Sequence, residues 1–310
     1  MFPFSFHQNH IVGINKRNLD YILPYNQRKY YPLADDKILT KEIANKAGIP
    51  TPELYGVIEF QKQAKNFQEI IGDRKSFVIK PSQGSGGQGV LVIKDVLDSG
   101  YQKTSGILMD YSEVKFHIQN ILSGLYSLGG KNDKAMIEYA VEFDQIFDEI
   151  TYQGVPDVRV VVFKGIPIMA MLRLPTRASD GKANLHSGGL GVGINMANGH
   201  TLSGIQGGNF IHSHPETRKN LGGRKIPFWE QILEISAKFY EMTNLGYLGV
   251  DIVLDKKRGP LVLEINARPG IAIQVANQEG LGRRLELAQA AKNLNSIQDR
   301  IKFAQDNFGV

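Results

Sequence analysis

Apolar residues recur along the chain in two patterns, one typical of helices and the other of strands. Between residues 228 and 242 they are spaced three or four positions apart after Pro227, which predicts a helix with a buried stripe. Further helices are expected at 35–46, 62–71, 111–122 and 280–307. Short apolar runs bounded by glycine, proline or charged residues predict strands at 54–60, 77–80, 90–93, 135–140, 159–163 and 167–174.

This mixture predicts an α+β protein, and 310 residues suffice for two closely associated subdomains. We expect an irregular N-terminal segment at 1–34 that packs against the rest, because it shows little periodicity. The smaller α+β subdomain is expected at 35–136 and the larger at 137–291, followed by the end of a C-terminal helix at 292–310. Within the larger part, a Gly- and Asn-rich stretch at 178–210 carries no regular pattern.

The segment 248–270 predicts a β-hairpin, since two apolar runs flank a Lys-Lys-Arg-Gly turn. With the turn centred between the second lysine and the arginine, Asp251 lies opposite Glu264, and a shift of one residue would place it opposite Asn266. Either register puts these three side chains on one face. Two carboxylates and an amide oxygen suit Mg²⁺, whereas a solvated acidic face is the alternative.

A strand ending in Lys80 leads into a loop that carries four glycines in six positions: Gly84, Gly86, Gly87 and Gly89. The backbone N–H groups of such a loop can bind phosphates, and Lys80 stands where a core residue would be expected. In a Walker A loop the lysine follows the glycines, whereas Lys80 precedes them here. In a Rossmann loop a helix follows the glycines, whereas a strand is predicted here. The pattern therefore favours a strand–loop–strand lid over phosphates rather than a plain flexible turn.

Asp157 and Arg159 share one face of a predicted strand, and Arg173 lies near the end of the next strand. A carboxylate can accept both hydroxyl groups of a ribose, and an arginine can bind phosphates or an acidic substrate. A surface ion pair is the alternative interpretation of Asp157 and Arg159.

Lys182, Asn184 and His186 lie in a glycine-rich loop. The asparagine amide can bind a phosphate oxygen or a metal-bound water. His186 could act as a general base or a hydrogen-bond donor, although a lone loop histidine is more often structural. His212 and His214 could ligate zinc, but no third ligand follows at a suitable spacing.

The amino-acid composition excludes several kinds of functional site. The absence of cysteine excludes disulfides, thiolate metal sites and cysteine nucleophiles, and it fits a reducing compartment. A net charge of +5 without a basic run interleaved with aromatics favours nucleotide phosphates and an acidic substrate over nucleic acid. No apolar run approaches the ~20 residues that cross a bilayer, and no cationic stretch precedes the first apolar residues. We expect a cytoplasmic protein that does not insert into membranes.

A series of sequence blocks, in this order, resembles the ATP-grasp superfamily, and most closely its glutamate-ligase-like branch that includes the ribosomal-protein-modifying ligases. The blocks are DDKILTKEIANKAGIPTPELYGVI, FVIKPSQGSGGQGV, MIEYA, DVRVVV, KANLHSGG and GVDIVLDKKRGPLVLEINARPG. The resemblance covers about residues 35–290, and the last two blocks are its most specific part. It implies an ATP-grasp fold in which two α+β subdomains clamp a nucleotide, with a reduced N-terminal segment.

The resemblance also implies roles for individual residues. The nucleotide set comprises Lys37 and Lys80 on the phosphates, Gly84, Gly86 and Gly87 in the lid, Glu138, Tyr139 and Val141 at the adenine hinge, and Asp157 and Arg159 at the ribose. The metal ligands are Asp251, Glu264 and Asn266. The catalytic set comprises Arg268 on the acyl-phosphate, Arg173 and Asn184 on substrate carboxylate and phosphate, and His186 in the same loop as Asn184.

The activity implied is that of an ATP-dependent carboxylate–amine ligase that uses Mg²⁺, with Mn²⁺ as a substitute. Such an enzyme forms a peptide-like bond through an acyl-phosphate and releases ADP and phosphate. The expected partners are a small-molecule acid and an amine, with glutamate or another acidic amino acid as the favoured donor and a peptide or protein tail as an alternative acceptor. Two other functions stay open: a kinase on the same scaffold, acting on a hydroxyl or a carboxylate, and a non-catalytic nucleotide-binding protein.

Overall fold

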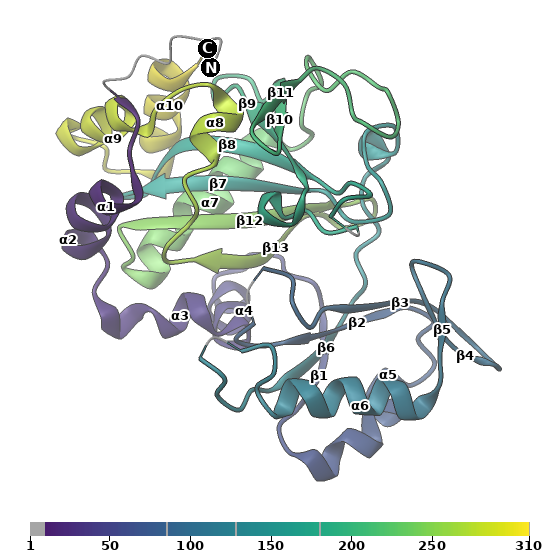
Figure 1. Ribbon diagram of the computed structural model, residues 1–310. Helices are drawn as coiled ribbons and strands as arrows, with labels where there is room; N and C mark the ends of the chain where they lie inside the picture. Colours follow the sequence, from purple (N-terminus) through teal and green to yellow (C-terminus); the bar gives the residue numbers. More distant parts are fainter. Residues whose placement is uncertain (1–9, 85, 128, 180, 310) are drawn as a thin grey trace. The chain divides into compact units, whose positions relative to one another are not determined.

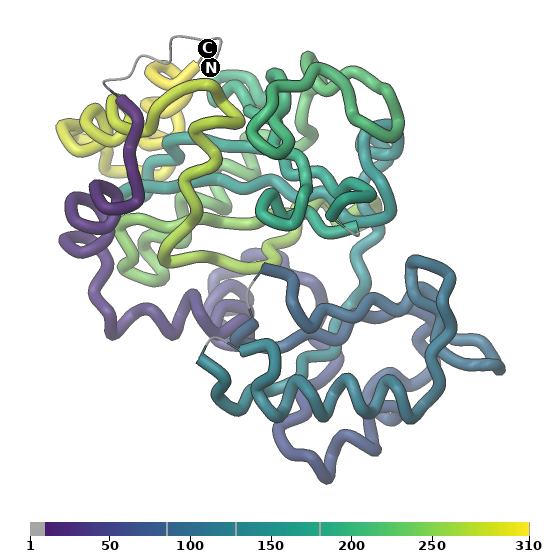
Figure 2. The backbone as a smooth tube through the Cα atoms, in the orientation of Figure 1, coloured from purple at the N-terminus to yellow at the C-terminus, as the bar shows by residue number. Residues whose placement is uncertain are grey.

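The computed structural model describes residues 10–84, 86–127, 129–179 and 181–309. Contacts within the chain divide it into two compact units. The smaller unit comprises residues 36–42 and 51–142, and the larger unit comprises the chain up to residue 35, residues 43–50 and the chain from residue 143 onward. Figures 1 and 2 show the course of the chain through both units.

A seven-stranded antiparallel sheet forms the centre of the larger unit, in the order β11-β10-β9-β8-β7-β12-β13. Its strands are β7 (Asp157–Phe163), β8 (Ile166–Leu174), β9 (Leu190–Ile194), β10 (Thr201–Gln206), β11 (Asn209–Ile211), β12 (Tyr247–Asp255) and β13 (Gly259–Asn266). The three neighbouring strands β8, β7 and β12 are almost entirely buried. They therefore carry nearly continuous apolar runs, with charged residues only where strands end or where charges pair.

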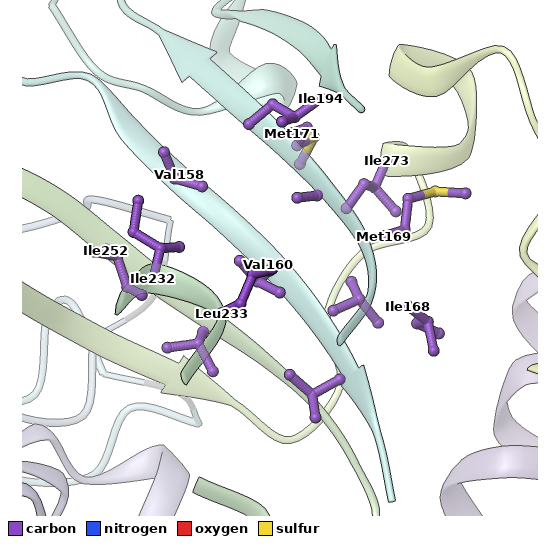
Figure 3. Close-up of a cluster of buried hydrophobic side chains, with 14 of the residues drawn as sticks. Val158, Val160, Ile168, Met169, Met171, Ile194, Ile232, Leu233, Ile252 and Ile273 are labelled. Carbon is purple, nitrogen blue, oxygen red and sulfur yellow. The ribbon is translucent and has the colours of Figure 1, made fainter. Parts of the chain in front are cut away.

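Helices pack on both faces of this sheet (Figure 1). They are α7 (Trp229–Thr243), α8 (Ile273–Asn277), α9 (Leu281–Ala290) and α10 (Ile297–Phe308). Ile232, Ile235 and Phe239 of the predicted stripe are buried, whereas Phe228 precedes α7 and is 50% exposed. Ile232 and Leu233 pack in one buried cluster with Val158, Val160 and Ile252 of the sheet (Figure 3). Side chains alternate across a strand, so this packing leaves Asp157, Arg159 and Asp251 on the opposite face.

The N-terminal segment is helical, so the expectation of an irregular segment is wrong. Its short helices are α1 (Ile14–Lys16), a π-helix at Arg17–Ile22, α2 (Leu23–Tyr25), a 3₁₀ turn at Arg28–Tyr30 and α3 (Pro32–Asp35). Only a narrow face is buried, with Tyr21 packed edge-on against Phe163 of β7 at 5.7 Å between ring centres. A face this narrow leaves little hydrophobic periodicity to detect.

The smaller unit contains a six-stranded sheet in the order β1-β6-β2-β3-β4-β5. Its strands are β1 (Leu54–Ile58), β2 (Phe77–Pro81), β3 (Leu91–Leu97), β4 (Gly100–Lys103), β5 (Leu108–Met109) and β6 (Ala135–Glu138). Its helices are a 3₁₀ turn at Gln61–Asn66, α5 (Phe67–Ile71) and α6 (Tyr111–Leu122), while α4 (Lys37–Lys46) begins in this unit and ends in the larger one. The antiparallel pair β2–β3 flanks the glycine loop, as the strand–loop–strand pattern predicts.

Two further sequence expectations are corrected by the structure. The Gly-rich stretch 178–210 contains β9 and β10, in which Gly193 lets α8 approach: a Cβ there would lie 2.7 Å from Ala276 O. The single helix expected at 280–307 is two helices, because the chain is extended at Ala291 and Ser296 caps a new helix start. None of the helices in the described ranges is both long enough and apolar enough to cross a membrane.

Candidate active site

The hairpin β12–β13 brings Asp251 and Glu264 directly opposite each other, as the sequence predicts. The turn between Asp255 and Gly259 is closed by the Asp255 carboxylate, which accepts from the N–H groups of Lys257 and Arg258 at 2.9 Å each. The register then shifts by one residue between Asp251 and Ile252. The turn is centred half a residue earlier than predicted, and this alone would not pair Asp251 with Glu264. The bulge shifts the pairing by one residue and so places these two residues opposite each other.

Asn266 completes a group of three side chains on this face. Its Nδ2 lies 3.5 Å from Asp251 Oδ2 and 3.5 Å from Glu264 Oε1. Two carboxylates and a carboxamide, whose oxygen and nitrogen can exchange places by rotation, are hard donors that suit Mg²⁺. The chemistry of these side chains therefore fits Mg²⁺, and Asp251, Glu264 and Asn266 stay its predicted ligands.

Two arginines neutralise Asp251, which is only 1% exposed. Arg159 donates to it through Nε at 2.6 Å and Nη2 at 2.5 Å, and Arg173 donates through Nη2 at 2.6 Å. Arg173 also donates through Nε to Asp157 Oδ1 at 2.5 Å. Strand pairing explains this arrangement, since Asp251 lies opposite Arg159 and Asp157 lies opposite Arg173. We call these four residues the Asp–Arg cluster.

The two carboxylates of the cluster titrate differently. Burial alone would raise the pKa of Asp251, but the guanidinium groups of Arg159 and Arg173 outweigh it and hold that pKa well below its usual range. For Asp157, burial dominates and raises the pKa to about 6, because it accepts only one contact from Arg173 while the charge of Asp251 lies close by. Asp251 is therefore firmly ionised, and Asp157 is the carboxyl group of the cluster that can be neutralised under mild acid.

In the smaller unit, a second buried charge group surrounds Glu138, which is 2% exposed. Lys80 and Lys41 both form ion pairs with it, the second at 2.9 Å from Nζ to Oε2. Lys41 also donates to Pro52 O at 2.5 Å. Burial lowers the pKa of Lys41 to about 8, whereas the two lysines hold the pKa of Glu138 below its usual range despite burial. Sequence reasoning missed Lys41, although it follows Lys37 by one helical turn.

The glycine loop is anchored by contacts at its entrance. Lys37 Nζ donates to Gly84 O at 2.6 Å, and Asp133 accepts from the backbone N–H of Gln83 at 3.0 Å and from Ser127 Oγ at 2.6 Å. Positive φ angles at Gly86 and Gly87, 64° and 74°, suit a loop that turns its N–H groups in one direction. Asp133 is a second residue that the sequence reasoning missed.

The model of one family matches residues 16–290, and that family is described as sugar-transfer associated ATP-grasp. The chain belongs to this ATP-grasp family. The superfamily and the α+β ATP-grasp fold inferred from the motifs are thereby confirmed, while the likeness to glutamate ligases within the superfamily stays a prediction.

Solved structures of ATP-grasp enzymes are also similar to the chain. The ligase PsnB with a minimal precursor is 13% identical over 86% of this chain and 63% of its own, with a TM-score of 0.46. D-alanine-D-alanine ligase from Coxiella burnetii is 13% identical over 90% and 59%, also at 0.46. The chain thus spans about three fifths of the length of these proteins. A comparison with curated proteins gave no match.

The remaining predicted residues of this ATP-grasp protein lie in loops. Arg268 lies two residues after the end of β13, is exposed, and has its guanidinium 5.3 Å from the centre of the Tyr31 ring. Asn184 Oδ1 accepts from the N–H of His186 at 3.1 Å and so begins a 3₁₀ turn, on which the His186 side chain is exposed. Tyr139 donates its N–H to Glu53 O at 2.9 Å, and Val141 follows in the connection between the units.

The two histidines considered for zinc have different surroundings. His214 is fully buried, with Nε2 3.1 Å from Pro175 O and Nδ1 accepting from the N–H of Glu216 at 3.3 Å. His212 is exposed. Within the described ranges, no group of three or more His, Cys, Asp or Glu side chains is arranged to hold a metal. His214 thus connects two loops of the larger unit.

The raised pKa of Asp157 predicts a pH-dependent stability. The folded protein holds a proton on Asp157 between pH about 6 and about 4, where the unfolded chain has released it, so acidification through this window stabilises the fold. In Asp157→Asn this response is absent. From pH ~7.5 to ~5, wild type should gain about 1 kcal/mol of unfolding free energy relative to the variant, measured by urea denaturation. A constant difference between the two proteins would contradict the assignment.

The Glu138 group predicts a large stability effect. Glu138→Gln leaves Lys41 and Lys80 buried without a counter-charge, which should cost about 3–5 kcal/mol of unfolding free energy. The control is Glu59→Gln, because the Glu59–Lys134 pair is exposed, with 41% and 43% of the two side chains accessible, and should contribute less than ~1 kcal/mol. Denaturant unfolding monitored by circular dichroism measures both variants. Equal losses would show that Glu138 is not needed to neutralise the two lysines.

Proposed function

We propose that the protein is an ATP-dependent carboxylate–amine ligase that acts through an acyl-phosphate and requires Mg²⁺. The observation that carries this proposal is the convergence of Asp251, Glu264 and Asn266 on one face of the hairpin, in contact with Arg159 and Arg173. Such a set can bind a metal–phosphate complex and stabilise the negative charge of a carboxylate that meets a phosphoryl group.

The nucleotide is proposed to bind through residues of the ATP-grasp pattern. Lys37, Lys80 and the glycine loop are assigned to the phosphates, and the backbone at 139–141 to the adenine, with Glu138 holding Lys80 in place. Asp157 is assigned to the ribose. Because its carboxylate already accepts from Arg173, ribose binding at Asp157 would share that carboxylate with the arginine.

The chemistry requires little covalent participation from the protein. A substrate carboxylate oxygen attacks the γ-phosphorus of ATP, and ADP leaves. An amine nitrogen then attacks the acyl carbon, phosphate leaves, and the amine loses a proton. Mg²⁺ held by the hairpin would neutralise phosphate charge. Arg173 and Arg268 would stabilise the acyl-phosphate, Asn184 would bind a phosphate oxygen, and the exposed His186 would accept the proton.

The proposal also extends to the class of substrate. The motif resemblance favours glutamate or another acidic amino acid as the amine donor, with a small acid or a peptide tail as acceptor. Because the family is described as sugar-transfer associated, we add sugar acids and amino sugars to the substrates to be tested. Mn²⁺ should substitute for Mg²⁺, because the ligands are oxygen donors. Action in the cytoplasm stays a prediction from the sequence.

A kinase on the same scaffold is the second candidate, and a non-catalytic nucleotide-binding protein is the third. Hydroxylamine separates the first two, because it converts an acyl-phosphate into a hydroxamate and leaves a phosphate ester unchanged. Nucleotide binding without ADP formation on any acid or metabolite extract would favour the third.

Replacing Glu264 tests the metal assignment. Glu264→Ala removes one of two carboxylate ligands, so ADP formation with ATP, Mg²⁺ and a panel of acids and amines should fall by about 100-fold or more. The control is Glu234→Ala on α7, since Glu234 is a surface residue paired with Lys238 at 2.7 Å, and it should keep the wild-type rate. Coupled detection of ADP and a ferric hydroxamate assay measure the two products. An unchanged rate in Glu264→Ala would contradict the metal site.

A further inference from the structure

The loop that carries Arg268 lies against the N-terminal segment of the chain. Both belong to the larger unit, and Figure 2 shows the segment beside the chain that leads from β13 into α8. The two are tied together beyond the loop as well, because Gln274 accepts from Val12 N–H at 2.8 Å and donates to Val12 O at 3.0 Å. Contacts of this kind, between residues more than 200 positions apart, fix one segment against the other.

Asn26 forms hydrogen bonds to both ends of the hairpin β12–β13. Its Nδ2 donates to Tyr247 O at 2.6 Å and to Ala267 O at 2.9 Å, and its Oδ1 accepts from Tyr247 N–H at 2.8 Å. Tyr247 begins β12, and Ala267 directly follows β13 and directly precedes Arg268. Asn26 is 3% exposed, so these three bonds are shielded from water and their loss would leave backbone groups unpaired.

Arg17 and Tyr31 hold the other side of Arg268. Arg17 Nη1 donates to Pro269 O at 2.7 Å, directly after Arg268. The Tyr31 ring lies under the guanidinium of Arg268 at 5.3 Å, within the range of a cation–π contact. Burial lowers the pKa of the Arg17 guanidinium, and the positive charge of Arg268 lowers it further. Three consecutive residues, 267–269, are thus each contacted by the N-terminal segment.

We propose that Asn26, Arg17 and Tyr31 are positioning residues for Arg268, and that the segment 12–31 fixes this arginine for an anionic acyl-phosphate. Arg268 is exposed and its side chain is long, so without a support it would sample many rotamers. Fixing it beforehand lowers the entropic cost of binding the reacting group. This inference rests on the proposed function for the role of Arg268, but the positioning itself is a property of the chain.

The positioning is tested first without substrate, by hydrogen exchange of the full chain. Asn26→Ala should speed exchange of the Tyr247 amide, whose N–H is donated to Asn26 Oδ1, by about tenfold or more. Exchange of the peptide covering residues 266–270 should rise with it, because Asn26 also holds Ala267 O at the other end of the hairpin. The control Gln27→Ala, an exposed neighbour, should not change it. Strand β8 serves as an internal reference. Equal exchange in the two variants would overturn the proposal. If Asn26→Ala does not fold, the activity arm decides alone.

The activity arm is a double-mutant cycle on Tyr31 and Arg268, with hydroxamate formation as readout. Tyr31→Leu should lower kcat by about fivefold with an unchanged KM for ATP, whereas Tyr31→Phe, which keeps the ring, should retain most of the rate. In the Arg268→Ala background, Tyr31→Leu should have no further effect. The control Tyr30→Leu removes a ring that lies under Lys29 instead. The same loss from Tyr31→Leu in both backgrounds would overturn the proposal.

Failure of the proposed function gives a different result. If no acid in the panel yields ADP or hydroxamate with wild type, the ligase assignment fails, while the exchange experiment still tests whether Asn26 fixes the Arg268 loop. If wild type is active and Arg268→Ala is equally active, Arg268 is not needed for the reaction. Holding Arg268 in place would then have no effect on activity.

Discussion

The charge of Asp251 is the constraint on which the larger unit depends. A carboxylate that is 1% exposed in the middle of a sheet is tolerated only if cations and hydrogen bonds compensate its desolvation. Arg159 and Arg173 supply three N–H contacts. Arg159 comes from β7, which pairs with β12, and Arg173 comes from β8, one strand further along the sheet. The order β8-β7-β12 is therefore a requirement of the Asp–Arg cluster as well as of the apolar core.

The smaller unit stabilises a buried carboxylate in the same way. One buried carboxylate, Glu138, is shared by Lys41 and Lys80, and Lys37 stands one turn before Lys41 beside the glycine loop. Cations and backbone N–H groups suit phosphates. In the larger unit, carboxylates and an amide suit a metal, with arginines in contact. In the proposed function, the cations of the smaller unit are assigned to phosphates and the carboxylates of the larger unit to the metal.

Much of this could be predicted from the sequence. The alternation of side chains along a hairpin fixes the common face of Asp251, Glu264 and Asn266, and the apolar stripe of α7 fixes its buried side. Other features depend on tertiary contacts that leave no local signal. The bulge that sets the register, the two-cation surroundings of Glu138 and the contacts of Asn26 with residues 247 and 267 arise only when distant segments meet. The sequence does not predict the strands β9 and β10 because both contain glycines, which lower strand propensity. Gly193 of β9 allows close packing against α8, and Gly204 of β10 allows close packing against Leu221.

The central claim is that a carboxylate oxygen attacks ATP at this site. It is tested most directly by supplying the acid substrate with ¹⁸O in its carboxyl group, together with ATP, Mg²⁺ and the amine, and analysing the released phosphate by mass spectrometry. The account predicts one ¹⁸O atom in each phosphate, because the acyl-phosphate breaks between carbon and oxygen. Release of ADP with unlabelled phosphate would contradict it.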